Sequence, residues 1–150
     1  MTDLPTGLAI HKLDGKRDLT ECFEIRRAVF IEEQQVPRDT EQDGLDVFYT
    51  HYLLKEGGKP IGTARAKVNA MNEGKMGRFC LVVDARKKGY GKALMEYILA
   101  DLKKNDKNLK KVQISAETVS MPFFEKLGFA KIGDEYQEAN IPHFAMVWTP

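Results

Sequence analysis

A short basic stretch with two glycines is the part of the sequence best suited to bind an anion. "VVDARKKGYG" (82–91) has the pattern of a strand end, then Arg86-x-x-Gly89-x-Gly91, then the start of a helix. Glycine lets the backbone approach a ligand closely, and the free amides of a first helical turn favour negative charge. With lysines on either side, the stretch predicts a pyrophosphate site. A glycine-containing helix start with a solvated basic rim would have the same pattern, so the motif alone leaves both interpretations open.

The stretch matches neither of two common phosphate-binding loops. It lacks the spacing GxxxxGK[ST], and it lacks GxGxxG with an acidic residue about 20 positions further on. A P-loop and a dinucleotide-binding fold are therefore disfavoured.

The rest of the chain predicts the elements that would position this stretch. Alternating apolar and polar residues, or short apolar runs, indicate strands. Apolar residues at helical spacing after Asp18 and after Gly89 indicate helices. A polar loop is expected over 34–46, and Gly128 is expected to end a short helix. The order is strand, helix, three strands, helix, strand, helix, strand, which predicts a single α/β domain over residues 1–150 with a mixed sheet. The expected strands are 8–13, 47–54, 60–68, 76–83, 111–116 and 144–148, and the later helices begin at the Arg86–Gly91 motif and at 121.

Further motifs connect the stretch to a known family. "FFEKLGF" (123–129) follows the RxxGxG helix start after one strand, and together they resemble the GNAT superfamily of acyl-CoA-dependent N-acetyltransferases. "RRAVFIEEQQVPRDTEQDGLDVFYTHYLL" (26–54) and "EANIPHFAMVW" (138–148) are similar to the ElaA/YjcF-like branch of small proteins. The resemblance implies a mixed, mostly antiparallel central sheet, flanked by helices and splayed between its fourth and fifth strands.

The same resemblance implies a site for acetyl-CoA as cosubstrate. Its pantetheine arm would lie in the splayed gap along the backbone of the fourth strand, and its pyrophosphate on the amides that open the next helix. Tyr90 is expected to pack inward. The cofactor-binding residues expected in this way are Leu81, Val82, Val83, Arg86, Lys87, Lys88, Gly89, Tyr90, Gly91, Lys92, Glu117, Phe124 and Lys126.

Acidic residues and a histidine in the branch motifs are the candidates for the acceptor site. A primary amine attacks as the neutral base, so a group must remove its proton. Expected catalytic residues are Glu33, Glu138 and His143, and expected substrate-binding residues are Phe30, Asp43 and Arg78. The acids among these residues could instead be inert surface groups. Arg78 and the acids could also form buried ion pairs with one another.

Two positions depart from the family pattern. Phe124 stands where related enzymes often have a tyrosine that protonates the leaving thiolate, and Glu117 stands where an asparagine is frequent. A phenyl ring has no proton to give, so Tyr136, Ser120 or water would have to replace that tyrosine.

Composition limits the remaining possibilities. The net charge is +1 over 150 residues, and the one dense basic run, "KKNDKNLKK" (103–111), lacks interleaved aromatic residues, so no nucleic-acid partner is expected. Cys22 and Cys80 are expected to be buried thiols, with one disulfide as the alternative. Without a membrane-length apolar run or an apolar signal core, a cytoplasmic protein is expected. No metal is expected, and a homodimer is allowed.

These features predict an N-acetyltransferase that moves the acetyl group of acetyl-CoA to a primary amine of a small molecule by direct attack. An amino sugar, a polyamine or an amino-acid-like molecule would fit. The alternatives are a protein or peptide N-acetyltransferase and a catalytically weak acyl-CoA-binding module.

Overall fold

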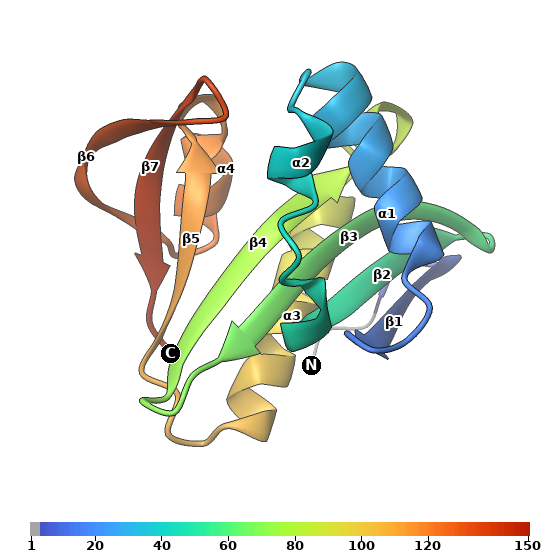
Figure 1. The fold of residues 1–150 in the computed structure, drawn as a ribbon. Helices are drawn as coiled ribbons and strands as arrows, with labels where there is room; N and C mark the ends of the chain where they lie inside the picture. The colour runs from blue at the N-terminus through green and yellow to red at the C-terminus, as the bar shows by residue number, and fades with distance from the viewer. Residues whose placement is uncertain (1–3) are drawn as a thin grey trace.

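A seven-stranded sheet forms the centre of the molecule (Figure 1), and the computed structural model describes residues 4–150 of the chain. The strand order is β1-β2-β3-β4-β5-β7-β6, and every neighbouring pair is antiparallel except β4 and β5, which are parallel. The strands are β1 (Leu8–Asp14), β2 (Thr50–Glu56), β3 (Lys59–Val68), β4 (Glu73–Leu81), β5 (Lys111–Glu117), β6 (Ala130–Glu138) and β7 (Ile141–Trp148). The helical segments are α1 (Thr20–Arg26), η1 (Arg27–Glu33), α2 (Arg38–Glu41), η2 (Asp46–Phe48), η3 (Val83–Ala85), α3 (Tyr90–Asn105), η4 (Thr118–Ser120) and α4 (Met121–Lys126).

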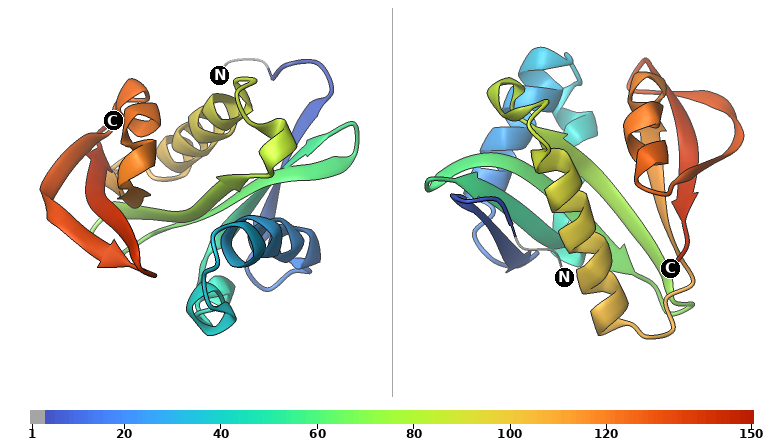
Figure 2. Two further views of the ribbon diagram at one scale, coloured as in Figure 1. Left: turned by 90° about the horizontal axis from the view of Figure 1, so that it is seen from above. Right: turned by 180° about the vertical axis from the view of Figure 1, so that it is seen from behind.

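Helices cover both faces of the sheet (Figure 2). α3 and α4 pack on one face and α1 on the other. α3 buries Leu94, Met95, Ile98, Leu99 and Leu102, a spacing that places all five on one side of a helix and joins them to the larger core. None of the helices within residues 4–150 is long and apolar enough to cross a membrane.

The smaller core lies under α1 and η1. Asp18 accepts hydrogen bonds from the amide and hydroxyl of Thr20, which supports the start of α1. The helix then widens into the π-helical segment η1. Its buried side packs Cys22, Ile25 and Val29 against the sheet, so that the end of η1 stands over β4. Cys22 and Cys80 are both buried free thiols, as the sequence favoured.

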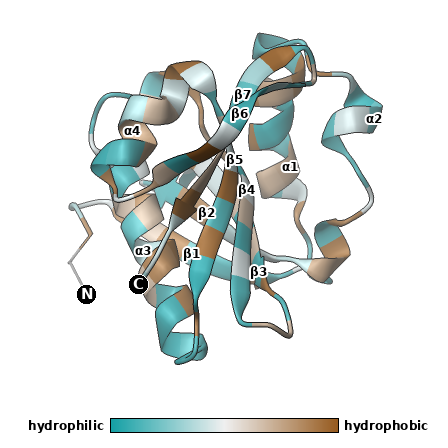
Figure 3. Cartoon of the chain, turned by 90° about the vertical axis from the view of Figure 1, so that its left-hand side faces the viewer, coloured by the Kyte–Doolittle hydropathy of each residue, from teal (hydrophilic) through white to brown (hydrophobic). Residues whose placement is uncertain are grey.

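The parallel joint between β4 and β5 is short. Pairing is restricted to Glu73, Gly74 and Lys75 of β4 with Lys111, Val112 and Gln113 of β5. Beyond these pairs the two strands diverge (Figure 1), while β4 stays paired with β3 and β5 with β7. Alternating residues of β5 face the core and the solvent (Figure 3). The predicted splay between the fourth and fifth strands is therefore confirmed.

Three sequence expectations about the elements need correction. Val47 and Phe48 were expected to begin a strand, but they lie in the turn η2 and are exposed; β2 begins at Thr50. β6 (Ala130–Glu138) was not predicted, since all nine of its residues are exposed and the sequence has no apolar alternation there. β7 begins at Ile141 rather than at Phe144 because its first residues pair with β6.

Candidate active site

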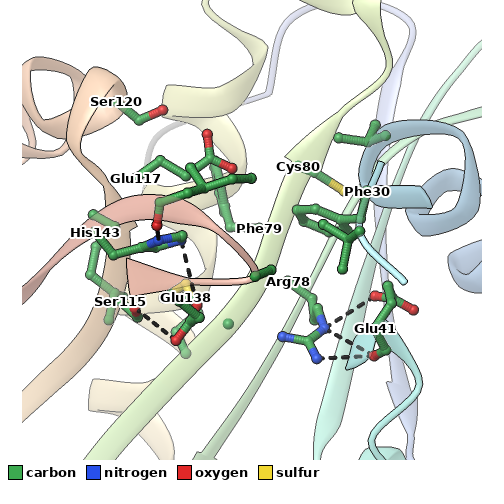
Figure 4. Close-up of a pocket in the computed structure, with 18 of the residues that line it drawn as sticks. Phe30, Glu41, Arg78, Phe79, Cys80, Ser115, Glu117, Ser120, Glu138 and His143 are labelled. Carbon is green, nitrogen blue, oxygen red and sulfur yellow. Dashed lines mark hydrogen bonds and ion pairs between the residues drawn. The ribbon is translucent and has the colours of Figure 1, made fainter. Parts of the chain in front are cut away.

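A pocket of about 890 Å³ lies where β4 and β5 part (Figure 4). We call its lining residues between Val29 and Arg86 the N-terminal wall, and those between Gln113 and His143 the C-terminal wall. Predicted site residues from distant parts of the sequence meet here. Those that line the pocket are Phe30, Glu33, Asp43, Arg78, Leu81, Arg86, Glu117, Phe124, Glu138 and His143.

Ion pairs hold the N-terminal wall together from beneath. Arg26, 1% exposed, donates from Nε to Glu41 Oε2 at 2.8 Å and from Nη1 to Asp46 Oδ1 at 2.7 Å. Glu41 is also buried, which the polar loop predicted over 34–46 did not suggest. Because each buried charge has an opposite partner, the loop is fixed against the sheet.

Asp43 belongs to the same network. Arg65 donates from Nη1 to Asp43 Oδ1 at 3.0 Å and from Nη2 to Oδ2 at 2.6 Å. These hydrogen bonds hold the pKa of Asp43 well below its usual range. The carboxylate predicted to bind the acceptor is thus already engaged by a guanidinium.

Glu33 and Arg86 form a further ion pair within the N-terminal wall. The Arg86 Nη1 and Nη2 atoms donate to Glu33 Oε2 and Oε1, each at 2.7 Å, and Nε donates to the Leu81 carbonyl oxygen at 3.0 Å. The guanidinium lowers the pKa of Glu33 by hydrogen bonding to its charged form. The Arg86 side chain, expected near a pyrophosphate, is directed at η1 instead.

The C-terminal wall carries a connected set of groups around His143. The imidazole Nδ1 lies 2.6 Å from the Ile141 carbonyl oxygen, which can only accept, so Nδ1 carries the proton. A neutral imidazole of this tautomer has its lone pair on Nε2, and this atom lies 3.4 Å from Glu138 Oε2. Ser115 donates to Glu138 Oε1 at 3.2 Å and shares a short hydrogen bond with Tyr136.

The aromatic end of the pocket is formed by α4 and β4. Phe124 packs edge-on against Phe79 and Phe129, with ring centroids 6.0 Å and 5.9 Å away. Cys80 lines the pocket from the smaller core, beside Phe30 (Figure 4), and burial raises the pKa of its thiol, so it stays protonated. Neither Phe124 nor Cys80 offers an ionised group to the pocket.

The start of α3 presents free backbone donors. The first backbone bond of this helix runs from the Ala93 amide to the Gly89 carbonyl oxygen at 3.2 Å, and no side chain caps the helix. The amides of Tyr90, Gly91 and Lys92 are therefore open to an anion. Gly89 adopts φ +82°, and a Cβ there would meet nothing within 4 Å.

The two loop glycines serve different purposes. A Cβ on Gly91 would lie 3.1 Å from the ring of Phe123, so this glycine permits the packing of α3 against α4.

Tyr90 packs partly against the core and donates to Glu56, which agrees with its expected inward direction. Lys87 takes a left-handed backbone conformation with φ +63°.

Several predicted cofactor residues lie outside the pocket lining. Val82 donates its amide to the Ile61 carbonyl oxygen at 2.9 Å, so that amide is not free for a ligand. Val83 is 65% exposed in η3, and Lys126 is exposed in the last turn of α4. The lining excludes these three residues and also Lys87, Lys88, Gly89, Tyr90, Gly91 and Lys92.

Some lining residues were not among the predicted site residues. Ser115 is the clearest, since it contacts both Glu138 and Tyr136. Its position in the alternating strand "KVQISA" was a usable signal, because it is on the face opposite the core residues Ile114 and Ala116. Within residues 4–150, no group of three His, Cys, Asp or Glu side chains is placed to hold a metal ion.

Comparison with known proteins identifies the class that this fold and pocket define. The family profile of the acetyltransferase (GNAT) domain matches residues 18–150. The chain belongs to this family and is an acyl-CoA-dependent acetyltransferase. An acyl-CoA N-acyltransferase from Pseudomonas aeruginosa is 25% identical, with a TM-score of 0.83 over 95% of this chain and 99% of that one.

Two further similarities define the branch. YjcF of Bacillus subtilis, an uncharacterized N-acetyltransferase, is 29% identical over 134 residues, which cover 89% of this chain and 94% of YjcF. The crystal structure of Escherichia coli ElaA has a TM-score of 0.84 at 22% identity, over 94% of this chain and 99% of ElaA. The protein is a member of the ElaA/YjcF-like branch of GNAT proteins.

Proposed function

We propose that the protein transfers the acetyl group of acetyl-CoA to the primary amine of a small molecule, by direct attack of the amine. The observation that carries this proposal is the Nε2 atom of His143, which faces Glu138 in a pocket of a size typical for small ligands. The two pocket walls enclose this group, so an acceptor has to enter between them to reach it.

The splayed sheet and the start of α3 suit the cosubstrate. When bound, acetyl-CoA supplies a thioester carbonyl open to attack and a thiolate leaving group. The backbone of β4 beyond Lys75 has no β5 partner and can pair with an extended pantetheine arm. The open amides of Tyr90, Gly91 and Lys92 can hold the pyrophosphate.

His143 is the favoured base among the three predicted catalytic residues. Its Nδ1 proton is held by the Ile141 carbonyl oxygen, which leaves Nε2 to accept a proton from an ammonium group. Glu138 then faces the imidazolium and stabilises its charge. Glu33 is a weaker candidate because Arg86 lowers its pKa.

Protonation of the leaving thiolate does not require Phe124. The hydroxyls of Ser115, Tyr136 and Ser120 all belong to the pocket lining. A free thiol has a pKa of about 8.5, so a thiolate is also a tolerable leaving group without an acid. Tyr136 is the favoured donor because a phenol gives up its proton more readily than an aliphatic hydroxyl.

The acceptor can be tested with purified protein, acetyl-CoA and a panel of amines. The panel contains amino acids, their amides, amino sugars, polyamines and lysine-containing peptides, and release of CoA is followed with a thiol reagent. We expect kcat/KM for the best small amine to exceed that for every peptide by about 10-fold or more. Transfer to peptides alone would refute the small-molecule acceptor. Binding of acetyl-CoA without transfer to any amine would indicate a binding module.

The cosubstrate half of the proposal can be tested at Gly89. Asn and Asp both tolerate the left-handed conformation of this position and both cap helices, so Gly89→Asn and Gly89→Asp form a matched pair. We expect the Asp variant to bind acetyl-CoA about 10-fold more weakly than the Asn variant by calorimetry, because its charge repels a pyrophosphate. Equal affinities would place the pyrophosphate elsewhere.

A further inference from the structure

Arg78 occupies an unusual backbone position inside the pocket. The register between β3 and β4 shifts here, since Thr63 pairs with Cys80 while Arg65 pairs with Gly77. Arg78 takes φ +53° in this bulge, a left-handed conformation that is unfavourable for a non-glycine residue. Glycine would adopt it freely, so the backbone alone does not account for an arginine here.

The guanidinium of Arg78 is anchored on one side only. Nη2 donates to the carbonyl oxygens of Glu41 at 2.9 Å and Thr40 at 3.2 Å, and Nε lies 3.1 Å from Glu41 Oε2. Nη1 has no hydrogen-bond partner among residues 4–150. In Figure 4 this nitrogen points away from Glu41 into the pocket, and the side chain is 23% exposed. The result is an oriented, unused donor in the N-terminal wall.

The opposite wall has the complementary charge. Its titratable side chains include the two carboxyl groups of Glu117 and Glu138 and the imidazole of His143, with no lysine or arginine among its lining residues. The Glu117 side chain makes no hydrogen bond or ion pair to another residue of the described chain. Figure 4 shows Glu138 and His143 across the pocket from Arg78. The C-terminal wall thus suits an ammonium group. The Arg78 donor in the N-terminal wall suits an oxygen atom that accepts a hydrogen bond.

We infer that Arg78 binds a carboxylate of the acceptor, and that the acceptor is an amino acid or another small molecule with both a free carboxylate and a primary amine. This inference rests on the proposed function, since it places the amine beside His143. A carboxylate oxygen accepts a charge-assisted hydrogen bond from Nη1, and the existing anchors keep the guanidinium in position before binding. Amines without a carboxylate leave this donor unpaired and are selected against.

Matched acceptors test the inference on the unmodified protein. Each amino acid is compared with its carboxamide, which keeps the size and the amine but removes the negative charge. We expect kcat/KM for the best amino acid to exceed that for its amide by about 10-fold or more, measured as CoA release. Equal or better transfer to the amides overturns the carboxylate site but leaves the acetyltransferase proposal intact. No transfer to any amine by protein that binds acetyl-CoA refutes the proposed function itself.

Variants of Arg78 test whether this side chain causes the preference for amino acids over their amides. Arg78→Gln removes the donor charge, and Arg27→Gln is the control, because Arg27 pairs with Glu32 outside the pocket. The measured quantity is kcat/KM for the amino acid divided by kcat/KM for its amide. We expect this ratio to fall about 10-fold in Arg78→Gln and to stay unchanged in Arg27→Gln. A folded Arg78→Gln that keeps the wild-type ratio assigns the preference to another residue and overturns the inference. If this variant does not fold, Arg78→Lys, which keeps the charge but loses the anchored fork, is compared in the same way.

Discussion

The two walls of the pocket use similar residue types in opposite ways. In the N-terminal wall, the carboxylates of Glu33, Glu41 and Asp43 are each held by an arginine at 2.6–3.1 Å. In the C-terminal wall, Glu138 contacts a neutral hydroxyl and an imidazole, and Glu117 has no partner within the described chain. The first arrangement fixes a loop in place, whereas the second leaves groups able to exchange a proton or bind a cation.

The difference shows that a carboxylate in a pocket is informative only together with its partners. A bidentate guanidinium lowers the pKa of a carboxylate and removes it from acid–base work near neutral pH. Among the predicted acids, Asp43 and Glu33 are each held by a guanidinium, whereas the partners of Glu138 in the described chain are Ser115 and His143. We therefore expect substitutions in the N-terminal network to act first on folding and substitutions in the C-terminal wall to act first on turnover.

The largest expected effect is the loss of the buried Arg26 charge. Arg26→Met removes one of the two arginine partners of Glu41 and one of the two of Asp46, and breaking a buried pair typically costs about 3–5 kcal/mol. Urea unfolding should show this loss in the free energy of unfolding. Arg27→Met is the matched control, since Arg27 and Glu32 are more than half exposed and should change stability by about 0.5 kcal/mol or less. Similar stabilities of the two variants would contradict the structural role of the network.

The next largest effect is expected at His143, where turnover should fall without a loss of folding stability. His143→Asn keeps an N–H that can reach the Ile141 carbonyl oxygen but removes Nε2. We expect kcat to fall by about 10²-fold, while the affinity for acetyl-CoA and the free energy of unfolding change little. Steady-state kinetics with calorimetry and urea unfolding measure the three quantities. A loss of stability with normal turnover would place His143 with the structural residues of the other wall.

The smallest expected effect concerns the missing tyrosine. Phe124→Tyr adds a hydroxyl at the aromatic end of the pocket, and we expect kcat to rise by less than about 10-fold, because the thiolate leaves readily without an acid. The measurement is the pH–rate profile of this variant alone and together with Tyr136→Phe. A clear gain only in the Tyr136→Phe background identifies Tyr136 as the resident acid. No change in either background places position 124 away from the leaving sulfur.

The sequence allowed the fold and the open start of α3 to be predicted, the elements from local patterns and the gap in the sheet from the family resemblance. Apolar periodicity predicted α3, and the Arg86–Gly91 motif predicted an open helix start, which the free amides of Tyr90 and Lys92 match. The family resemblance placed the gap between the fourth and fifth strands. The short pairing of Glu73–Lys75 with β5 confirms it.

Pairing partners were the part that the sequence could not supply. Glu33 and Arg86 are 53 positions apart, and nothing local shows that they form a bridge. Arg78 looked like a possible ligand for an acceptor, but its anchors on Thr40 and Glu41 depend on the fold of a distant loop. β6 was missed for a related reason: its nine residues are all exposed, and only pairing with β7 makes them a strand.

The short parallel joint also bears on the exposure of strand edges to other chains. An unpaired strand edge is a template on which other extended chains can add, and such edges promote aggregation. Past Lys75, β4 has an edge of this kind in the middle of the sheet. Here the edge lies in a recess, since β5, β6 and β7 stand opposite it (Figure 1). The same recess that can admit a slender ligand shields the edge from the strands of neighbouring molecules.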